Sequence, residues 1–161
     1  MGEETIKKEV ALGGTFDPVH DGHRALFREA FSRGDVTIGL TSDALAGRIR
    51  PSGRQVQVYD HRRCALAREL REIADDHNRT FTIQKLHSPT GIADNPKFDV
   101  LVVSPETEST AHWINDIRER GAVPPLEIVV VDHVRADDGD IISSTRIIAG
   151  EIDEHGAVIA K

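Results

Sequence analysis

The chain has 161 residues, 39% of them hydrophobic, which suits one compact domain with its own core, and we expect a single domain over residues 1–161. The formal net charge of −7 argues against a nucleic-acid binder, because such proteins usually carry a basic excess. The chain shows no apolar run near the roughly 20 residues that span a bilayer, no signal-peptide pattern and a single cysteine, and so predicts a cytoplasmic protein without a membrane partner.

The first third of the chain predicts a strand, a helix and a second strand. Residues 7–12 lean apolar and end at two glycines, which indicates a strand and then a tight turn. Apolar side chains recur at helical spacing between residues 25 and 31, and alternate over residues 35–40 as in a strand. Residues 48–58 contain Pro and Gly and predict a long loop.

The middle of the chain continues the alternation of helix and strand. Apolar residues at helical spacing between residues 66 and 73 predict a helix that ends near residues 77–78. Residues 80–86 alternate imperfectly and indicate a strand. Residues 88–97, with two prolines and a glycine, predict a loop.

The last third predicts two more strands and two more helices. Residues 99–103 form an apolar run typical of a strand buried on both faces, and residues 126–131 predict another. Ser104-Pro105 suits a helix N-cap with proline at the first helical position. Residues 111–117 carry the buried stripe of that helix, and residues 143–149 predict a short final helix that ends at a glycine.

Strands that alternate with helices predict an α/β fold: a Rossmann-like parallel sheet of about five strands with helices on both faces. In such sheets, ligands bind beyond the carboxyl ends of the strands, at a switch point of the topology. Functional side chains are therefore expected in residues 13–23, in residues 104–107 and near Ser143.

A glycine- and histidine-rich segment follows the first predicted strand. Gly14 lets the backbone turn sharply and approach a ligand, and Thr15 brings a hydroxyl to the edge of the strand. His20 and His23 bracket Gly22 at the start of a helix, so both imidazoles lie on one side of its first turn. Their N–H groups could join the helix N-terminus in binding a phosphate.

Other interpretations of the histidine pair remain open. The two side chains could bind zinc if distant His112 or His133 completed the ligand set. They could also be surface histidines of a plain capped helix. A dinucleotide-binding turn is disfavoured because the Gly-x-Gly-x-x-Gly pattern is absent, and the Walker lysine motif is absent too.

A second polar motif opens the final helix. Ser143, Ser144 and Thr145 offer hydroxyls and unpaired backbone N–H groups that suit a triphosphate. Arg146 adds a cation with forked donors. The alternative is an ordinary serine N-cap with a solvated arginine.

Taken together, the motifs resemble those of the nucleotidylyltransferase superfamily, and within it the archaeal-type phosphopantetheine adenylyltransferases. The superfamily motifs are Thr-Phe-Asp-Pro with His-x-Gly-His, and Ile-Ser-Ser-Thr about 120 residues later. The more specific similarity spans nearly the whole chain and is carried by residues 102–107, 114–118 and 142–156.

This resemblance implies that ATP and 4′-phosphopantetheine give dephospho-coenzyme A and pyrophosphate. An alternative is adenylyl transfer to another phosphorylated acceptor, such as nicotinamide mononucleotide or FMN. The acceptor's phosphate attacks the α-phosphorus, so no protein nucleophile is needed, which agrees with Cys64 lying in a helix pattern where we expect it to be buried. Catalysis would consist of positioning and charge stabilisation.

The resemblance also implies roles for individual residues. His23 would stabilise charge on the α-phosphate, and His20 would contact the same phosphates. The implied acceptor-binding residues are Gly14, Thr15, Phe16, Arg48 and Arg50. The implied ATP-binding residues are Gly22, Glu106, Ser143, Ser144, Thr145 and Arg146. Mg²⁺ would accompany ATP, and no metal site of the protein itself is expected.

Three positions qualify this assignment. Ile148 stands where the family commonly has a basic residue, and Arg146 could take over that role. The family's loop lysine after the second strand is missing, so that Arg48, Arg50 or Arg54 would have to bind phosphate with a different geometry. Glu106 could touch the nucleotide ribose or serve only as a first-turn helix carboxylate.

Overall fold

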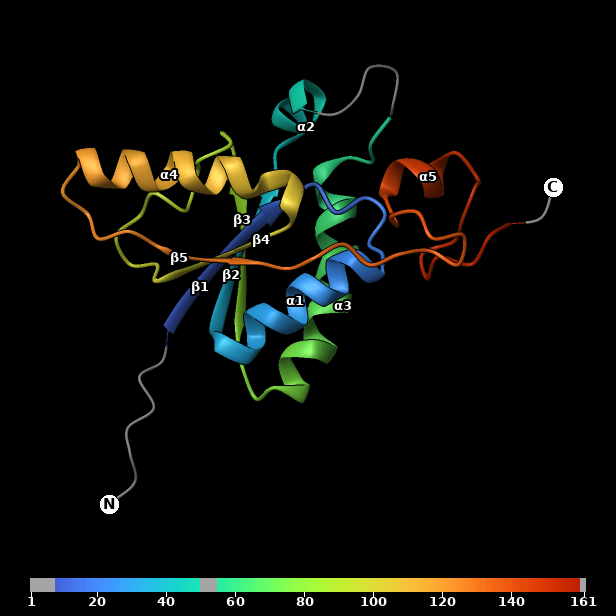
Figure 1. The fold of residues 1–161 in the computed structure, drawn as a ribbon, viewed down its shortest axis with the longest axis horizontal. Coiled ribbons are helices and arrows are strands. Elements are labelled where there is room, and N and C mark those ends of the chain that lie inside the picture. Colours follow the sequence, from blue (N-terminus) through green and yellow to red (C-terminus); the bar gives the residue numbers. More distant parts are fainter. Residues whose placement is uncertain (1–7, 50–54, 160–161) are drawn as a thin grey trace.

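The computed structural model describes residues 8–49 and 55–159, and its centre is one five-stranded sheet (Figure 1). All neighbouring strands run parallel, in the order β3-β2-β1-β4-β5. The strands are β1 (Lys8–Gly14), β2 (Gly34–Thr41), β3 (Phe81–Leu86), β4 (Val100–Val103) and β5 (Glu127–Val130). The order reverses beside β1, so the switch point lies between β1 and β4. This confirms the predicted fold class.

Helices cover both faces of the sheet, as alternating side chains of β1 show. Val10 and Leu12 pack in one apolar cluster with α1 and α3, whereas Ala11 packs in a second cluster with α2 and α4. This alternation follows from the two-residue period of a strand. The helices are α1 (Asp21–Arg33), α2 (Asp43–Ile49), α3 (Tyr59–Asp76), η1 (Pro105–Thr107), α4 (Glu108–Arg120) and α5 (Ser144–Ile148).

The chain after β5 returns to the start of α1. In Figure 1 this orange-to-red segment passes the start of α1 and carries α5 away from the sheet. Two hydrogen bonds hold it there: Ser144 Oγ donates to the Pro18 carbonyl at 3.0 Å, and the Asp21 N–H donates to the Glu154 carbonyl at 3.0 Å. Buried Ile152 gives the segment a small apolar core of its own.

Two boundaries near the first two strands differ from the sequence-based expectation. The chain does not turn at Gly13-Gly14, because β1 continues through Gly14 and the left-handed residue is Phe16, with φ of 50°. A short helix, α2, occupies residues 43–49, where no element was expected before the loop predicted from residue 48. Seven residues are too few for a clear helical period.

Two expectations of burial are also wrong. The run at residues 126–131 becomes the edge strand β5, in which Glu127 and Val130 are exposed. Cys64 is exposed on α3, because Arg62, Leu66 and Leu70 form the buried stripe of that helix. The final helix agrees with the prediction: Ser143 caps it, and Gly150 follows it with φ of 78°.

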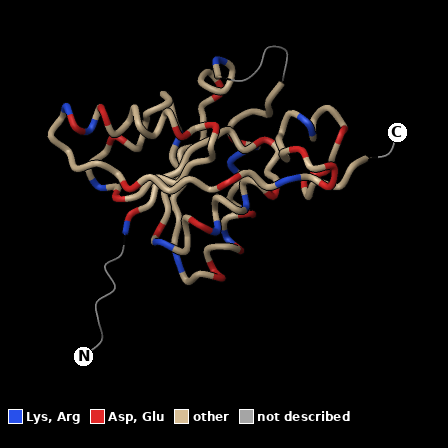
Figure 2. The backbone as a smooth tube through the Cα atoms, viewed as in Figure 1, with Lys and Arg blue, Asp and Glu red and all other residues tan. Residues whose placement is uncertain are grey.

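Charged residues of both signs are spread over the described chain. Figure 2 shows Lys and Arg interspersed with Asp and Glu on the helices and connecting segments. Within residues 8–49 and 55–159, no helix is long and apolar enough to cross a membrane.

Candidate active site

Two cavities open near the carboxyl ends of β1 and β4. The larger has a volume of about 620 Å³ and is lined by both strand ends, α2, α4 and the loop around residues 89–93. The smaller, of about 460 Å³, lies between the start of α1, the chain after β5 and the start of α5. The cavities share one wall, made of His23, Leu26, Ser104 and Glu106. Ligands in the two cavities would therefore meet beside His23.

His20 and His23 cap the helix that carries them. Nδ1 of His20 accepts a hydrogen bond from the Gly22 N–H at 3.0 Å, and Nδ1 of His23 accepts one from the His20 N–H at 3.2 Å. The arrangement is a capping box in which imidazoles replace the usual serine and glutamate. Because each Nδ1 is an acceptor, a neutral ring carries its proton on Nε2.

This capping refines how α1 could bind an anion. The N–H groups of His20, Asp21 and Gly22 already have protein acceptors, so these three are engaged within the protein. An anion at the start of α1 would therefore meet the imidazole rings and not these three backbone N–H groups. The capped-helix interpretation is correct in its geometry, but His20 is only 6% exposed and is not a surface residue.

Gly14 and Phe16 shape the wall of the larger cavity together. An ideal Cβ on Gly14 would lie 2.9 Å from Cζ of Phe16, so a side chain at position 14 would displace that ring. The Phe16 ring in turn meets the His23 ring edge-on, with centroids 5.0 Å apart. The absence of a side chain at Gly14 therefore allows Phe16 to pack against His23.

Thr15 lies at the same strand edge but lines neither cavity. Its Oγ1 is 3.0 Å from Oγ1 of Thr41 at the end of β2, and Thr41 does line the larger cavity. Behind both threonines lies the buried side chain of Arg62. Sequence reasoning missed Thr41 and Arg62, although an arginine in helical register with Leu66 and Leu70 could have indicated a buried cation.

The second polar motif lies beside the first in the folded chain, although about 120 residues separate the two in the sequence. Ser143, Ser144 and Thr145 line the smaller cavity together with His20 and Gly22. Ser143 Oγ accepts the Arg146 N–H at 3.2 Å and caps α5, whereas Ser144 Oγ binds the Pro18 carbonyl. The structure thus brings together the residues that were predicted to hold a triphosphate.

The predicted basic residues are placed differently. Arg146 lines neither cavity and forms ion pairs with Asp138 and Glu151. Its hydrogen bonds to Asp138 and then to Glu151 raise the pKa of the Arg146 guanidinium. Arg48, at the end of α2, donates to the His87 carbonyl at 3.4 Å. Arg50 and Arg54 lie outside the described residues. Phosphate binding by these arginines stays a prediction.

The histidines suggested for a zinc site do not gather in one place. His112 pairs with Glu108 on α4, at 3.3 Å, whereas His133 lines the smaller cavity. Among residues 8–49 and 55–159, no group of three or more His, Cys, Asp or Glu side chains is arranged to hold a metal ion.

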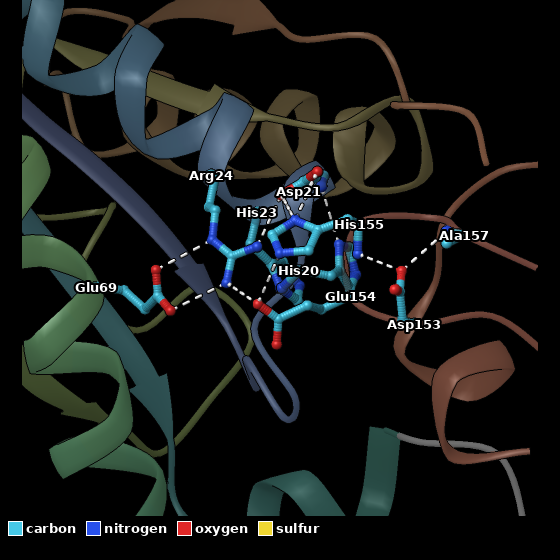
Figure 3. Close-up of polar contacts among 10 residues, drawn as sticks. His20, Asp21, His23, Arg24, Glu69, Asp153, Glu154, His155 and Ala157 are labelled. Carbon is cyan, nitrogen blue, oxygen red and sulfur yellow. Dashed lines mark hydrogen bonds and ion pairs between the residues drawn. The ribbon is translucent and has the colours of Figure 1, made fainter. Parts of the chain in front are cut away.

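A network of charges around Arg24 ties α1 to the C-terminal segment (Figure 3). The guanidinium binds Glu69 on α3, Asp21 on α1 and Glu154 near the C-terminus, at 2.7–3.0 Å. The hydrogen bond to Glu69 raises the pKa of Arg24 most. Burial raises the pKa of Asp21, but hydrogen bonds from Arg24 and His155 outweigh it and hold that pKa below its usual value. Arg24 thereby ties α1, which carries the first motif, to α3 and to the segment that follows the second motif.

The sequence of the chain is similar to those of known transferases. The family model described as cytidylyltransferase-like matches residues 11–150. Phosphopantetheine adenylyltransferase of Methanosarcina acetivorans is 44% identical over 151 residues, covering 92% of this chain and 94% of the relative. The protein of the same name from Methanothermobacter thermautotrophicus is 41% identical over 154 residues, covering 94% and 90%.

Solved structures share the fold. A protein of unknown function from Archaeoglobus fulgidus superposes with a TM-score of 0.66 at 38% identity, over 77% of this chain and 89% of that one. A lipopolysaccharide core biosynthesis protein from Thermoplasma volcanium gives 0.57 at 17% identity, over 77% and 95%. The second likeness concerns the fold alone.

Proposed function

The chain belongs to the cytidylyltransferase-like family, and from this membership and the site we propose that it transfers the AMP portion of ATP to 4′-phosphopantetheine. The products are dephospho-coenzyme A and pyrophosphate. Support comes from relatives named phosphopantetheine adenylyltransferase that are about 40% identical over most of the chain. One structural observation carries the proposal: the two cavities meet at a wall that contains His23.

A two-substrate transfer needs such a meeting point. The smaller cavity presents the Ser143, Ser144 and Thr145 segment and the His20 ring, which suits the triphosphate of ATP. The larger cavity is mostly apolar and suits the acceptor's arm, with its phosphate at the shared wall. Both reacting groups would then lie beside His23.

The chemistry follows from this placement. An oxygen of the acceptor's phosphate attacks the α-phosphorus of ATP, and the bond from that phosphorus to the bridging β-phosphate oxygen breaks as pyrophosphate leaves. The Nε2 N–H of His23 donates to a nonbridging α-phosphate oxygen as charge develops there. His20 supports the same phosphates. Holding the two substrates in line supplies the remaining catalysis.

Mg²⁺ accompanies ATP in this proposal. The walls of the smaller cavity offer the carboxylates of Glu106 and Asp132, and hard oxygen ligands of this kind suit Mg²⁺. Together with the phosphate oxygens, these two side chains would hold the ion and its water. The ion would supply neutralisation of the triphosphate charge.

The lining of the larger cavity supports a slender acceptor. Its lining is dominated by aliphatic side chains, and its aromatic members other than His23 are Phe16 and Trp113. Phe16 is already packed against His23 and Phe27, so it is not available to stack on a flavin. A flexible pantetheine arm needs only a narrow apolar groove with a few polar contacts.

The deciding experiment measures pyrophosphate release with each acceptor at saturating Mg-ATP. We expect kcat/KM for 4′-phosphopantetheine to exceed that for nicotinamide mononucleotide and FMN, with dephospho-coenzyme A identified by mass. Replacing ATP with CTP tests the nucleotide and should abolish most turnover. Preference for another acceptor would overturn the substrate assignment but leave the transfer chemistry intact.

A further inference from the structure

Arg118 is a buried cation in the last turn of α4, where it is 3% exposed. Within the described residues its guanidinium donates four hydrogen bonds, and each acceptor is a backbone carbonyl. The acceptors are the carbonyls of Ala93 at 2.9 Å, Asn95 at 3.0 Å, Phe98 at 3.0 Å and Pro124 at 2.8 Å. Three of these carbonyls belong to the connection between β3 and β4.

That connection supplies part of the wall of the larger cavity. We call residues 88–98 the cavity loop, and its members that line the cavity are Pro89, Thr90, Ile92 and Ala93. The backbone of the cavity loop bonds to itself over three residues, as from the Ala93 N–H to the Thr90 carbonyl at 3.1 Å. Bonds of this range fix the turns within the loop, but they do not fix its distance from α4.

Another part of the same wall comes from α4, whose Ile114 lines the cavity. Ile114 and Arg118 are four residues apart, so they lie on the same side of the helix in successive turns. Ile114 and Ala93 also belong to one apolar cluster. The hydrogen bond from Arg118 to the Ala93 carbonyl therefore connects two elements that line the cavity, directly beside it.

Packing alone does not explain a charge at this position. Burying a cation is costly when its partners are neutral dipoles. Burial accordingly lowers the pKa of Arg118, although Asp99 and Asp94 attract the charge and oppose this effect. What arginine offers here is its planar fork, which presents five donors in fixed directions, whereas lysine concentrates its charge at one point. The fork can hold several carbonyls of one loop at once.

From these contacts we propose that Arg118 is a positioning residue that sets the distance between α4 and the cavity loop, and thereby the affinity for the acceptor's arm. The inference rests on the proposed function for the identity of that acceptor. A wall that is already in place need not be ordered by the ligand, so less binding energy is lost. Among the described residues, the smaller cavity is lined by none of the cavity loop, so ATP should not depend on Arg118.

The same segment of α4 then has three separate tasks. Ile114 lines the cavity, and Arg118 holds the cavity loop. Asn115 exchanges two hydrogen bonds with the backbone of Leu126, just before β5, at 2.8 and 3.1 Å. Asn115 therefore fixes α4 to the sheet, and Arg118 fixes the loop to α4.

Binding of the arm without its phosphate separates this role from a purely structural one. Pantetheine, 4′-phosphopantetheine and Mg-ATP are each titrated by calorimetry, well below the melting temperature of every variant. Arg118→Met keeps the length of the side chain without its donors, and Arg118→Lys keeps the charge without the fork. Arg120→Met is the matched control, because Arg120 lies on the same turn of α4 and is exposed.

We expect Arg118→Met to weaken pantetheine and 4′-phosphopantetheine by the same factor, about 10-fold, because the ligand must now order the wall itself. The KM for ATP, and kcat at saturating acceptor, should stay unchanged. Arg118→Lys should recover little of the affinity, and Arg120→Met should bind like the wild type. Wild-type affinity for pantetheine in folded Arg118→Met, or an equal loss of ATP affinity, would overturn the proposal.

Gly91→Ala tests the wall if neither Arg118 variant folds. An ideal Cβ on Gly91 would lie 2.0 Å from Cδ1 of Leu86, so the substitution displaces the cavity loop without touching Arg118. The same selective loss of arm binding is expected, and unchanged pantetheine affinity would overturn the proposal. Failure of the proposed function is distinguishable, because it would appear in the wild type as no pyrophosphate release with 4′-phosphopantetheine.

Discussion

The imidazole rings of His20 and His23 are stacked, with centroids 3.8 Å apart and planes inclined by 20°. Backbone N–H groups of α1 bind both Nδ1 atoms, so both neutral rings keep their protons on Nε2. The helix that carries the rings therefore sets their tautomer as well as their direction. Any change that moves one ring is expected to disturb the other.

His23→Ala should fold and lose roughly 100- to 1,000-fold in kcat, as expected when one preorganised donor is removed. It also removes the capping-box hydrogen bond from the His20 N–H to His23 Nδ1, a loss of about 1 kcal/mol of stability. His23→Gln separates the two effects, because glutamine at this helix position can restore the bond to the His20 N–H. We expect His23→Gln to regain melting temperature but not turnover.

The control for this pair is His112→Ala, because His112 is exposed on α4 and binds only Glu108 among the described contacts. It should keep wild-type turnover. Normal turnover by folded His23→Ala would remove His23 from the mechanism.

Gly22→Ala should impair activity through His20. An ideal Cβ at position 22 would lie 2.8 Å from Cε1 of His20, so the ring must shift from its stacked position. Gly47→Ala is the matched control, since a Cβ there meets nothing within 4 Å. Alanine in a helix is about 0.5–1 kcal/mol more favourable than glycine, so this control should keep activity and gain slightly in stability. Steady-state kinetics and thermal melting compare the two, and equal activity would show that His20 tolerates displacement.

Activity should require Mg²⁺ and survive removal of zinc. The proposed nucleotide brings a triphosphate, whereas the described histidines do not assemble into a zinc ligand set. Pyrophosphate release is measured during a Mg²⁺ titration, after treatment with a zinc-selective chelator, and zinc content is measured in parallel. Tightly bound stoichiometric zinc, with activity lost on its removal, would restore the zinc interpretation of His20 and His23.

The Asp21 carboxylate should stabilise the fold in neutral solution but not in strong acid. Its pKa lies below the ordinary value of 3.8, because hydrogen bonds from Arg24 and His155 outweigh the effect of burial. A depressed folded-state pKa contributes stability that is complete above the unfolded value and is lost as pH falls below about 3.8. Asp21→Asn should therefore lower the melting temperature at pH 7 and differ less from wild type near pH 3. If Asp21→Asn and the wild type differed in melting temperature by the same amount at pH 7 and near pH 3, the lowered pKa of Asp21 would be contradicted.

Trp113 should report on the larger cavity. It is the single tryptophan of the chain, is 48% exposed and lines that cavity from α4. Adding 4′-phosphopantetheine should bury part of the indole and change its emission, with saturation at a fixed stoichiometry. Adding ATP alone, which is proposed to occupy the smaller cavity, should change the emission less. If ATP changed the emission more than 4′-phosphopantetheine did, the proposed assignment of the two ligands to the two cavities would have to be reversed.

Local patterns were sufficient to predict the fold and the principal motifs. The periods of strands and helices depend on neighbouring residues, so the parallel sheet and most of its helices were predictable. Residues 100–103 of the run predicted at residues 99–103 form the fully buried β4. The motif around Gly22 is equally local, because His20 and His23 cap the helix on which they lie.

Contacts between distant segments depended on the tertiary structure. Nothing near Ser144 in the sequence indicates that its hydroxyl binds the Pro18 carbonyl, and nothing near Arg24 indicates a bond to Glu154. Arg146 looked like a phosphate ligand beside its serines, yet the folded chain pairs it with Asp138 and Glu151.

The sequence by itself determined which side chains could carry the chemistry, because their spacing places them on single turns and strand ends. Only the tertiary structure decided that His23 lies in the wall between two cavities and that Arg62 is buried behind Thr41. The physical reason is that a hydrogen bond or a shared cavity wall depends on distance in space. Residues that are far apart in the chain carry no periodic signal of that distance.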